Sequence, residues 1–252
     1  MEIGVIGLGG NGRAVVGQLL EKTARNLSVY DPDGRSVRRA VNVCATAAEL
    51  CDRCDRIVVA LDASADLTRL CNSIAPFVRP GQIFIDLTDT SPALAHAAAN
   101  GMRRLGAAYI DCGVFGREGL DGPFILFAGG DSEAFAAALP LIRCFAPDCH
   151  YAGPPGRGRA MRVICRALAA QLMRGVGEAA ALAASFGVGR EAFISALAAF
   201  ERVADPLAEL GGGLPGFSAG ELAEDAALAS EMARRAGLEL GGLFAAGERA
   251  EP

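Results

Sequence analysis

The chain has 252 residues, of which 52% are hydrophobic and 21% are charged, and its net charge is −5. The hydrophobic fraction excludes a disordered chain, and the length suits one large domain or two modest ones. The longest uncharged stretch, residues 90–102, is shorter than the roughly 20 residues that a membrane-spanning helix needs. The negative charge argues against nucleic acid as a partner, because phosphate binding needs clustered positive charge.

The first residues of the chain and its cysteines indicate the cellular compartment in which we expect the protein. The chain begins with a strand-like segment rather than a basic region followed by an apolar one, which favours the cytoplasm. Most of the eight cysteines lie in apolar runs, where a reduced cysteine behaves as a small hydrophobic residue. Cys51 and Cys54 have the spacing of a metal or redox pair, but no second close pair matches it. We therefore expect no metal site.

Strand-like and helix-like segments alternate over the first 150 residues. Strands are predicted at residues 3–6, 27–30, 56–61, 82–86, 108–111 and 124–128. Helices are predicted at residues 11–22, 47–51, 66–75, 91–105 and 131–144. Because strands that alternate with helices form βαβ units, this order predicts an α/β fold with a doubly wound, mainly parallel sheet of the Rossmann type.

The pattern changes after Gly153-Pro154-Pro155-Gly156, which is a strong break. Beyond it, the predicted segments are helices at about 158–186 and 190–200, a loop at 211–216, and a helix that opens at Ser218-x-x-Glu221 and ends at Gly237. We therefore expect a dinucleotide-binding domain at residues 1–153 and an all-helical substrate and dimerisation domain at residues 154–252.

A glycine motif, Gly7-Leu8-Gly9-Gly10-Asn11-Gly12, follows the first predicted strand and opens the first predicted helix. Glycines let the backbone approach a pyrophosphate, which the helix N-terminus stabilises. Asp31 ends the second strand, where its carboxylate suits two ribose hydroxyls and would repel a 2′-phosphate. The motif predicts NAD(P)(H) as cofactor with NAD favoured, although Arg35, Arg38 and Arg39 could still receive a phosphate. The predicted cofactor-binding residues are Gly7, Leu8, Gly9, Asn11, Gly12, Asp31, Leu61, Asp62 and Thr88.

Four blocks of the sequence point to one family. They are residues 3–9 with Asn11-Gly12, residues 80–92, residues 109–117 with Gly129-Gly130, and residues 156–162, which lead into the long helix with Glu178-Ala179. In these blocks the chain resembles the β-hydroxyacid dehydrogenase family, which contains 3-hydroxyisobutyrate dehydrogenases, 6-phosphogluconate dehydrogenase and the related imine reductases. The resemblance implies a Rossmann domain and an NAD(P)-dependent oxidoreductase.

The positions that handle substrate in that family differ in this chain. In the substrate-loop motif of the family, Asp-x-x-Val-Ser-Gly-Gly, Phe115 replaces the Ser and Arg117 replaces the second Gly. Arg162 replaces the catalytic Lys, and Cys165 and Arg166 replace an Asn pair. Thr88-Asp89 stands where the family has Ser-Thr, and Glu224-Asp225 stands where it has a late Lys-Asp pair. The resemblance therefore implies a retained cofactor site and an altered substrate site.

The basic replacements can bind an anion. Arg162 offers a positive charge and a forked donor, but a guanidinium does not release its proton near neutral pH and cannot act as a general acid. Arg162 and Arg166 are one helical turn apart, with Arg159 just before them, so the stripe is able to clamp a carboxylate or phosphate. The alternative is a solvated basic face that pairs with acids of a partner subunit.

The acidic and cysteine replacements carry other chemistry. Asp89, Glu224 and Asp225 suit a cationic iminium or amine if they reach the cleft, and are otherwise exposed acids. Cys112 and Cys165 are nucleophiles only if they are partly exposed and electropositive; otherwise they belong to the core. The predicted catalytic residues are Arg162, Asp89 and Cys165.

Three functions remain open from the sequence. The first is an NAD(P)-dependent oxidoreductase with an altered small-molecule substrate. The second is a cofactor-binding pseudoenzyme or regulatory partner without turnover, and the third is an imine-reductase-like C=N reductase. In each case we expect a homodimer formed through the C-terminal helices, because the long helix is apolar on more than one face, and no nucleic-acid or membrane partner.

Overall fold

The structure is a computed structural model that describes residues 2–23, 26–37, 41–116, 120, 124–200, 229 and 232–238. It divides into two compact units, Met1–Arg166 and Ala167–Pro252. Arg38, Arg39, Arg117, Glu224 and Asp225 lie outside the described residues, as do the predicted loop at 211–216 and the start of the helix predicted from Ser218.

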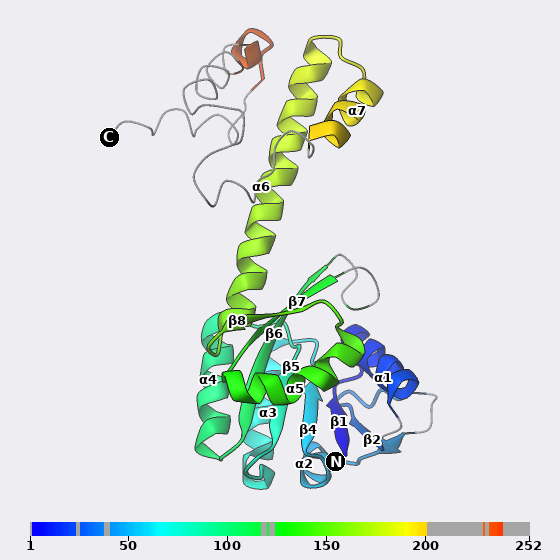
Figure 1. The fold of residues 1–252 in the computed structure, drawn as a ribbon, viewed down its shortest axis with the longest axis vertical. Helices are drawn as coiled ribbons and strands as arrows, with labels where there is room; N and C mark the ends of the chain where they lie inside the picture. The colour runs from blue at the N-terminus through cyan, green and yellow to red at the C-terminus, as the bar shows by residue number, and fades with distance from the viewer. Residues whose placement is uncertain are drawn as a thin grey trace, which may run out of the picture. The chain divides into compact units, whose positions relative to one another are not determined.

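Within the described residues, the first unit is built on an eight-stranded sheet in the order β3-β2-β1-β4-β5-β6-β7-β8 (Figure 1). The strands are β1 (Ile3–Ile6), β2 (Leu27–Tyr30), β3 (Asn42–Val43), β4 (Arg56–Val59), β5 (Ile83–Asp86), β6 (Ala108–Gly116), β7 (Phe124–Gly129) and β8 (Cys149–Gly153). The strands β3, β2, β1, β4, β5 and β6 are parallel to one another. Strand β7 is antiparallel to β6, and β8 is parallel to β7. The order β3-β2-β1-β4-β5-β6 is that of a Rossmann fold, which confirms the predicted fold class.

Helices cover both faces of this sheet and bury a separate apolar layer on each. They are α1 (Gly10–Lys22), α2 (Ala47–Arg53), α3 (Ser64–Ile74), α4 (Pro92–Arg104) and α5 (Ser132–Phe145). Helices α1 and α5 contribute Leu19 and Ile142 to one layer, while α2 and α4 contribute Leu50 and Met102 to the other. The central strands are buried on both sides, which explains why each reads as a continuous apolar run.

The helical segments after the break agree with the predictions. Helix α6 spans Arg157–Ser185, with its first residues in the first unit, and α7 spans Arg190–Phe200. Residues 232–235 are helical, and Gly237 follows with a φ of 68°, the left-handed conformation of a helix C-terminus. Within the described ranges, none of the helices combines the length and apolar content that crossing a membrane requires.

Four details of the sheet differ from the sequence prediction. Strands β3 and β8 were not expected, because β3 has two exposed residues and β8 is an edge strand whose middle is exposed. Strand β6 continues to Gly116 rather than residue 111, since it pairs with β7 in a hairpin. Strand β4 ends at Val59 rather than Leu61, because the next residues form the turn that packs against the glycine motif.

Candidate active site

The turn from β1 into α1 is shaped by glycines that have no room for a side chain. Gly7 has a φ of +94°, and a Cβ there would lie 2.3 Å from the carbonyl oxygen of Ala60, just after β4. A Cβ on Gly12 would lie 1.9 Å from the carbonyl oxygen of Gly7. Helix α1 has no side-chain cap and no acidic residue in its first turn. Its positive end is therefore suited to an anion.

Asp31, directly after β2, holds this turn in place. Its Oδ2 accepts a hydrogen bond from the N–H of Leu8 at 2.6 Å, and its Oδ1 accepts from the N–H groups of Asp33 at 2.9 Å and Arg35 at 3.1 Å. The Asp31 side chain is 1% exposed. A carboxylate has about four lone-pair positions, so Asp31 organises the backbone around the groove while keeping a free acceptor position.

The loop after β4 completes the groove beside the glycine turn, and a residue after β5 supports that loop from behind. Leu61 and Asp62 line it together with Gly7, Gly9 and Asp31. Thr88 is fully buried, and its hydroxyl accepts a hydrogen bond from the N–H of Leu61 at 3.1 Å. Thr88 thus joins the ends of two strands and sets the position of Leu61.

A buried ion pair that the sequence prediction missed ties α6 to the sheet. Arg159 is 1% exposed, and its Nη2 donates to the carbonyl oxygen of Asp86 at 2.8 Å and to the Asp86 carboxylate at 2.9 Å. Its Nη1 donates to the carbonyl of Cys112, and the Tyr109 hydroxyl donates to Asp86 Oδ2 at 2.6 Å. Burial, the largest cause, raises the pKa of Tyr109 well above its usual value, so Tyr109 is a neutral hydrogen-bond donor here.

Asp111, on β6, fixes the beginning of the same helix. Its two carboxylate oxygens accept from the N–H groups of Gly156 at 2.6 Å and Arg159 at 2.9 Å, which satisfies donors at the N-terminus of α6. A Cβ on Gly158 would lie 2.3 Å from the Asp111 carbonyl oxygen, so the helix start packs directly on β6. Burial, the largest cause, raises the pKa of Asp111 despite these hydrogen bonds.

One turn further along α6, Arg162 pairs with Asp89. Arg162 is 8% exposed, and its Nη1 donates to Asp89 Oδ2 at 2.8 Å while its Nη2 contacts the other carboxylate oxygen. Nη1 of Arg166, whose side chain is 55% exposed, lies 3.8 Å from Asp89 Oδ2. Burial, the largest cause, lowers the pKa of Arg162. The alternative of a solvated face paired only with a partner subunit is wrong for Arg162, which is buried and paired within the chain.

The pair borders a cavity of about 120 Å³ that also reaches the glycine motif. Its lining includes Asn11 from α1, Asp89, Val114 from β6, Arg162 and Arg166. The Asn11 side chain accepts a hydrogen bond from the N–H of Leu120 at 3.2 Å. In the described residues, Arg162 Nε is buried without a hydrogen-bond partner. Asn11, one of the predicted cofactor-binding residues, thus lines the same space as Asp89 and Arg162.

The cysteines do not contribute to this cavity. Cys112 is fully buried and burial raises its pKa well above the usual value, which confirms the core interpretation. Cys165 is half-buried on α6. Burial, the main cause, raises the pKa values of Cys51 and Cys54 to about 12, and no cluster of metal-ligating side chains exists among the described residues.

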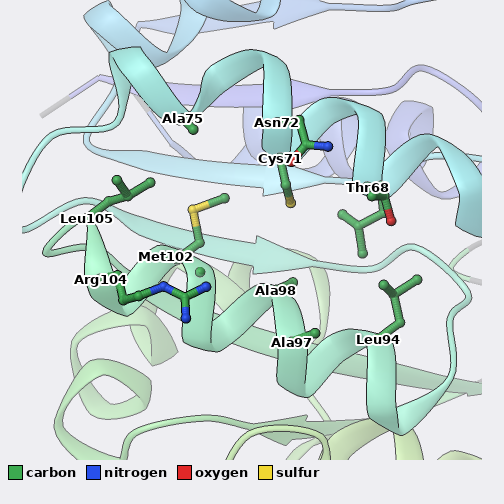
Figure 2. A pocket seen from close by; sticks show the side chains of 12 residues that line it. Thr68, Cys71, Asn72, Ala75, Leu94, Ala97, Ala98, Met102, Arg104 and Leu105 are labelled. Carbon is green, nitrogen blue, oxygen red and sulfur yellow. The ribbon is translucent and has the colours of Figure 1, made fainter.

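A larger pocket of about 370 Å³ lies between α3 and α4, away from the glycine motif. Figure 2 shows that Leu94, Met102 and Leu105 of the α4 segment face Cys71 and Ala75 of the α3 segment across it. Burial raises the pKa of the Cys71 thiol to about 11, which keeps it protonated near neutral pH. The pocket is mostly apolar and lacks the paired charges of the Arg162 cavity, so it is not the candidate active site.

The comparisons with known proteins agree with this geometry. Residues 2–153 match the family described as the NAD binding domain of 6-phosphogluconate dehydrogenase. The chain belongs to this family. Mouse mitochondrial 3-hydroxyisobutyrate dehydrogenase is 30% identical over 186 residues, which cover 70% of this chain and 55% of that protein. The chain therefore spans little more than half the length of that relative.

Two solved structures share the fold of the chain. An imine reductase from Myxococcus stipitatus in complex with NAD+ has a TM-score of 0.81 at 18% identity, covering 98% of this chain and 91% of the other. A reductive aminase from Aspergillus terreus in complex with NADPH and ethyl-5-oxohexanoate has a TM-score of 0.73 at 17% identity, covering 99% and 93%. At these identities the similarity establishes the fold alone.

Proposed function

We propose that this protein is an NAD(P)-dependent oxidoreductase that interconverts a carbonyl compound and the corresponding alcohol, on a substrate that carries an anionic group. The observation that carries the proposal is the cavity lined by both Asn11, from the glycine motif, and Arg162. It brings a fixed cation next to the element that begins the cofactor site. The name of the mouse relative, a 3-hydroxyisobutyrate dehydrogenase, agrees with a hydroxy acid as substrate.

The residues of the β1–α1 turn fit a dinucleotide. The glycines at 7 and 12 allow a close backbone approach, the N-terminus of α1 is free of an acidic cap, and Asp31 lies beside the turn. Residues 7–12 would bind the pyrophosphate, and the remaining acceptor position of Asp31 would take a hydrogen bond from a ribose hydroxyl, which favours NAD over NADP. When bound, the nicotinamide supplies or accepts the hydride.

Arg162 provides charge rather than a proton. A guanidinium stays protonated near neutral pH, so it stabilises a negative oxygen or orients a carboxylate. The proton must then come from a water molecule at the cavity, because Asp89 is the acceptor carboxylate of the ion pair with Arg162. Because Arg162 and Arg166 flank the single carboxylate of Asp89, the cavity wall carries a net positive charge. An anionic substrate therefore fits better than a cationic one. Its anionic group would replace Asp89 as the partner of the two guanidinium groups.

A C=N reductase is the second candidate, because the Asp89 carboxylate borders the cavity and its side chain is 59% exposed. An iminium cation would pair with Asp89 if Arg162 and Arg166 turned away. The third candidate, a cofactor-binding protein without turnover, follows if no substrate of either class reacts.

The assay is NADH and NADPH oxidation with a panel of oxo acids, their neutral ketone analogues and cyclic imines. We expect turnover of the oxo acids, and Arg162→Ala should lower kcat/KM for them by about 10²–10³, the scale for losing one preorganised donor. Arg157→Ala, an exposed position on the same helix, is the matched control. Turnover of imines but not oxo acids would select the second candidate, and cofactor binding without any turnover would select the third.

The proposal includes a homodimer formed through α6. Apolar side chains on this helix are 45–77% exposed in the single chain. They are Val163, Ile164, Leu168, Leu172, Met173 and Val176. Exposed apolar surface of this extent is typical of a protein–protein interface, and a second copy of α6 offers a matching apolar face.

A further inference from the structure

An ion pair crosses the groove beside the glycine turn. Nη2 of Arg35, in the loop after β2, lies 2.7 Å from Oδ2 of Asp62, in the loop after β4. The same guanidinium contacts Asp33, and its Nε lies 3.6 Å from Oδ1 of Asp31. Arg35 therefore connects the two loops whose separation decides whether a cofactor can enter.

The Asp62 carboxylate occupies the space in front of Gly9. A Cβ built on Gly9 would lie 2.1 Å from Asp62 Oδ1 and 3.0 Å from Arg35 Nη1. In this glycine motif, the second glycine is the one whose missing side chain lets the pyrophosphate approach the backbone. Here that approach is taken by a carboxylate, and the groove retains a cavity of only about 10 Å³. A single water molecule needs about that much.

A pyrophosphate and the Asp62 carboxylate cannot share this position. Both are negatively charged and would need the same space in front of Gly9, and a like charge within about 4–6 Å disfavours the charged form of each group. The Asp62 side chain is 57% exposed and is free to rotate into solvent, whereas Asp31 is 1% exposed and is held by backbone donors. Asp62 is therefore the carboxylate that leaves when a dinucleotide binds.

We propose that Asp62 and Arg35 form a latch over the phosphate-binding turn. Without cofactor, the Asp62 carboxylate lies where a phosphate of the cofactor would bind. When the cofactor enters, the Arg35–Asp62 ion pair is replaced by an ion pair between Arg35 and a phosphate of the dinucleotide. A guanidinium binds phosphate through two parallel hydrogen bonds, and Arg35 already lies beside Gly9. The latch rests on the proposed dinucleotide function and makes Asp62 a gate rather than the cofactor-binding residue that the sequence predicts.

Isothermal titration of the full chain with NADH and with NADPH tests the latch without measuring activity. Asp62→Asn keeps the side-chain shape and removes the charge, so we expect the Kd for NADH to fall by about tenfold. Asp66→Asn is the matched control, because Asp66 borders the same groove but pairs with Arg69 at 2.9 Å. The control should change the Kd less than twofold, which separates the latch from a general loss of negative charge.

The role of Arg35 is tested in the Asp62→Asn background, where its competing partner is gone. Adding Arg35→Ala should raise the Kd by about tenfold, the scale of one charge-assisted contact. An equal loss for both dinucleotides would place Arg35 on the pyrophosphate, and a loss for NADPH alone would place it on the 2′-phosphate; either result supports the exchange. No loss for either dinucleotide would overturn it.

Two results separate failure of the latch from failure of the proposed function. The latch is overturned if the wild-type chain binds NADH and Asp62→Asn binds it equally tightly or more weakly. Asp62 would then remain a cofactor-binding residue. Failure of the wild type, Asp62→Asn and the double variant to bind either dinucleotide at millimolar concentration would overturn the proposed function, and the latch with it. Circular dichroism of each variant checks that the substitutions leave the fold intact.

Discussion

The buried contact between Arg159 and Asp86 makes a quantitative prediction about stability. Arg159→Met keeps most of the length and apolar volume of the side chain but removes its charge. Asp86, which is fully buried, would then keep the Tyr109 hydroxyl and the Thr88 N–H as partners for its carboxylate and lose the guanidinium. The carbonyl oxygens of Asp86 and Cys112 would also lose their hydrogen bonds from Arg159.

The cost follows from the charge left behind. Removing one partner of a buried ion pair typically destabilises a protein by 3–5 kcal/mol, because the other charge stays buried without compensation. We therefore expect Arg159→Met to lower the free energy of unfolding by about 4 kcal/mol. Adding Asp86→Asn removes the stranded charge, so the double variant should lose about half as much or less. Arg157→Met, an exposed position two residues away, should stay within about 0.5 kcal/mol of wild type.

Urea unfolding followed by circular dichroism measures these differences, and hydrogen exchange of the β5 and β6 amides assigns the transition to the first unit. A loss below about 1 kcal/mol in Arg159→Met would show that Asp86 finds other compensation. A double variant as unstable as the single one would show that the loss comes from packing rather than from a stranded charge.

Three further outcomes are expected. Gly12→Ala should abolish NADH binding in calorimetry because its Cβ collides with the turn, while Gly17→Ala, with open space around it, should keep binding and stabilise α1 by about 0.4–1 kcal/mol. Leu172→Asp should convert a dimer into a monomer in light scattering; a monomeric wild type at micromolar concentration would contradict the proposed interface. Arg162→Lys with Asp89→Thr should oxidise hydroxy acids faster than Arg162→Lys alone, as measured by NADH formation, because Asp89 would otherwise hold the lysine.

The parts of the fold that the sequence predicts are those with local signals. The glycine motif, the apolar strands and the left-handed glycine at 237 each lie within a few residues of the structure they specify. Strand β3 escaped prediction because its two exposed residues carry no alternating pattern. The anchor of α6 escaped for another reason: Arg159 and Asp86 are 73 residues apart, and nothing near either residue marks the other as its partner.

A separation of the same size between Arg162 and Asp89 explains why the sequence alone did not decide the charge of the substrate. Arg162 alone indicates an anionic substrate and Asp89 alone a cationic one, yet the two side chains form one ion pair across 73 residues. Arg35 and Asp62 show the same arrangement beside Gly9. In both places a charge that would attract a ligand is held by an opposite charge of the chain itself. Ligand binding must then exchange one ion pair for another, so the affinity depends on the difference between two pairs rather than on either residue alone.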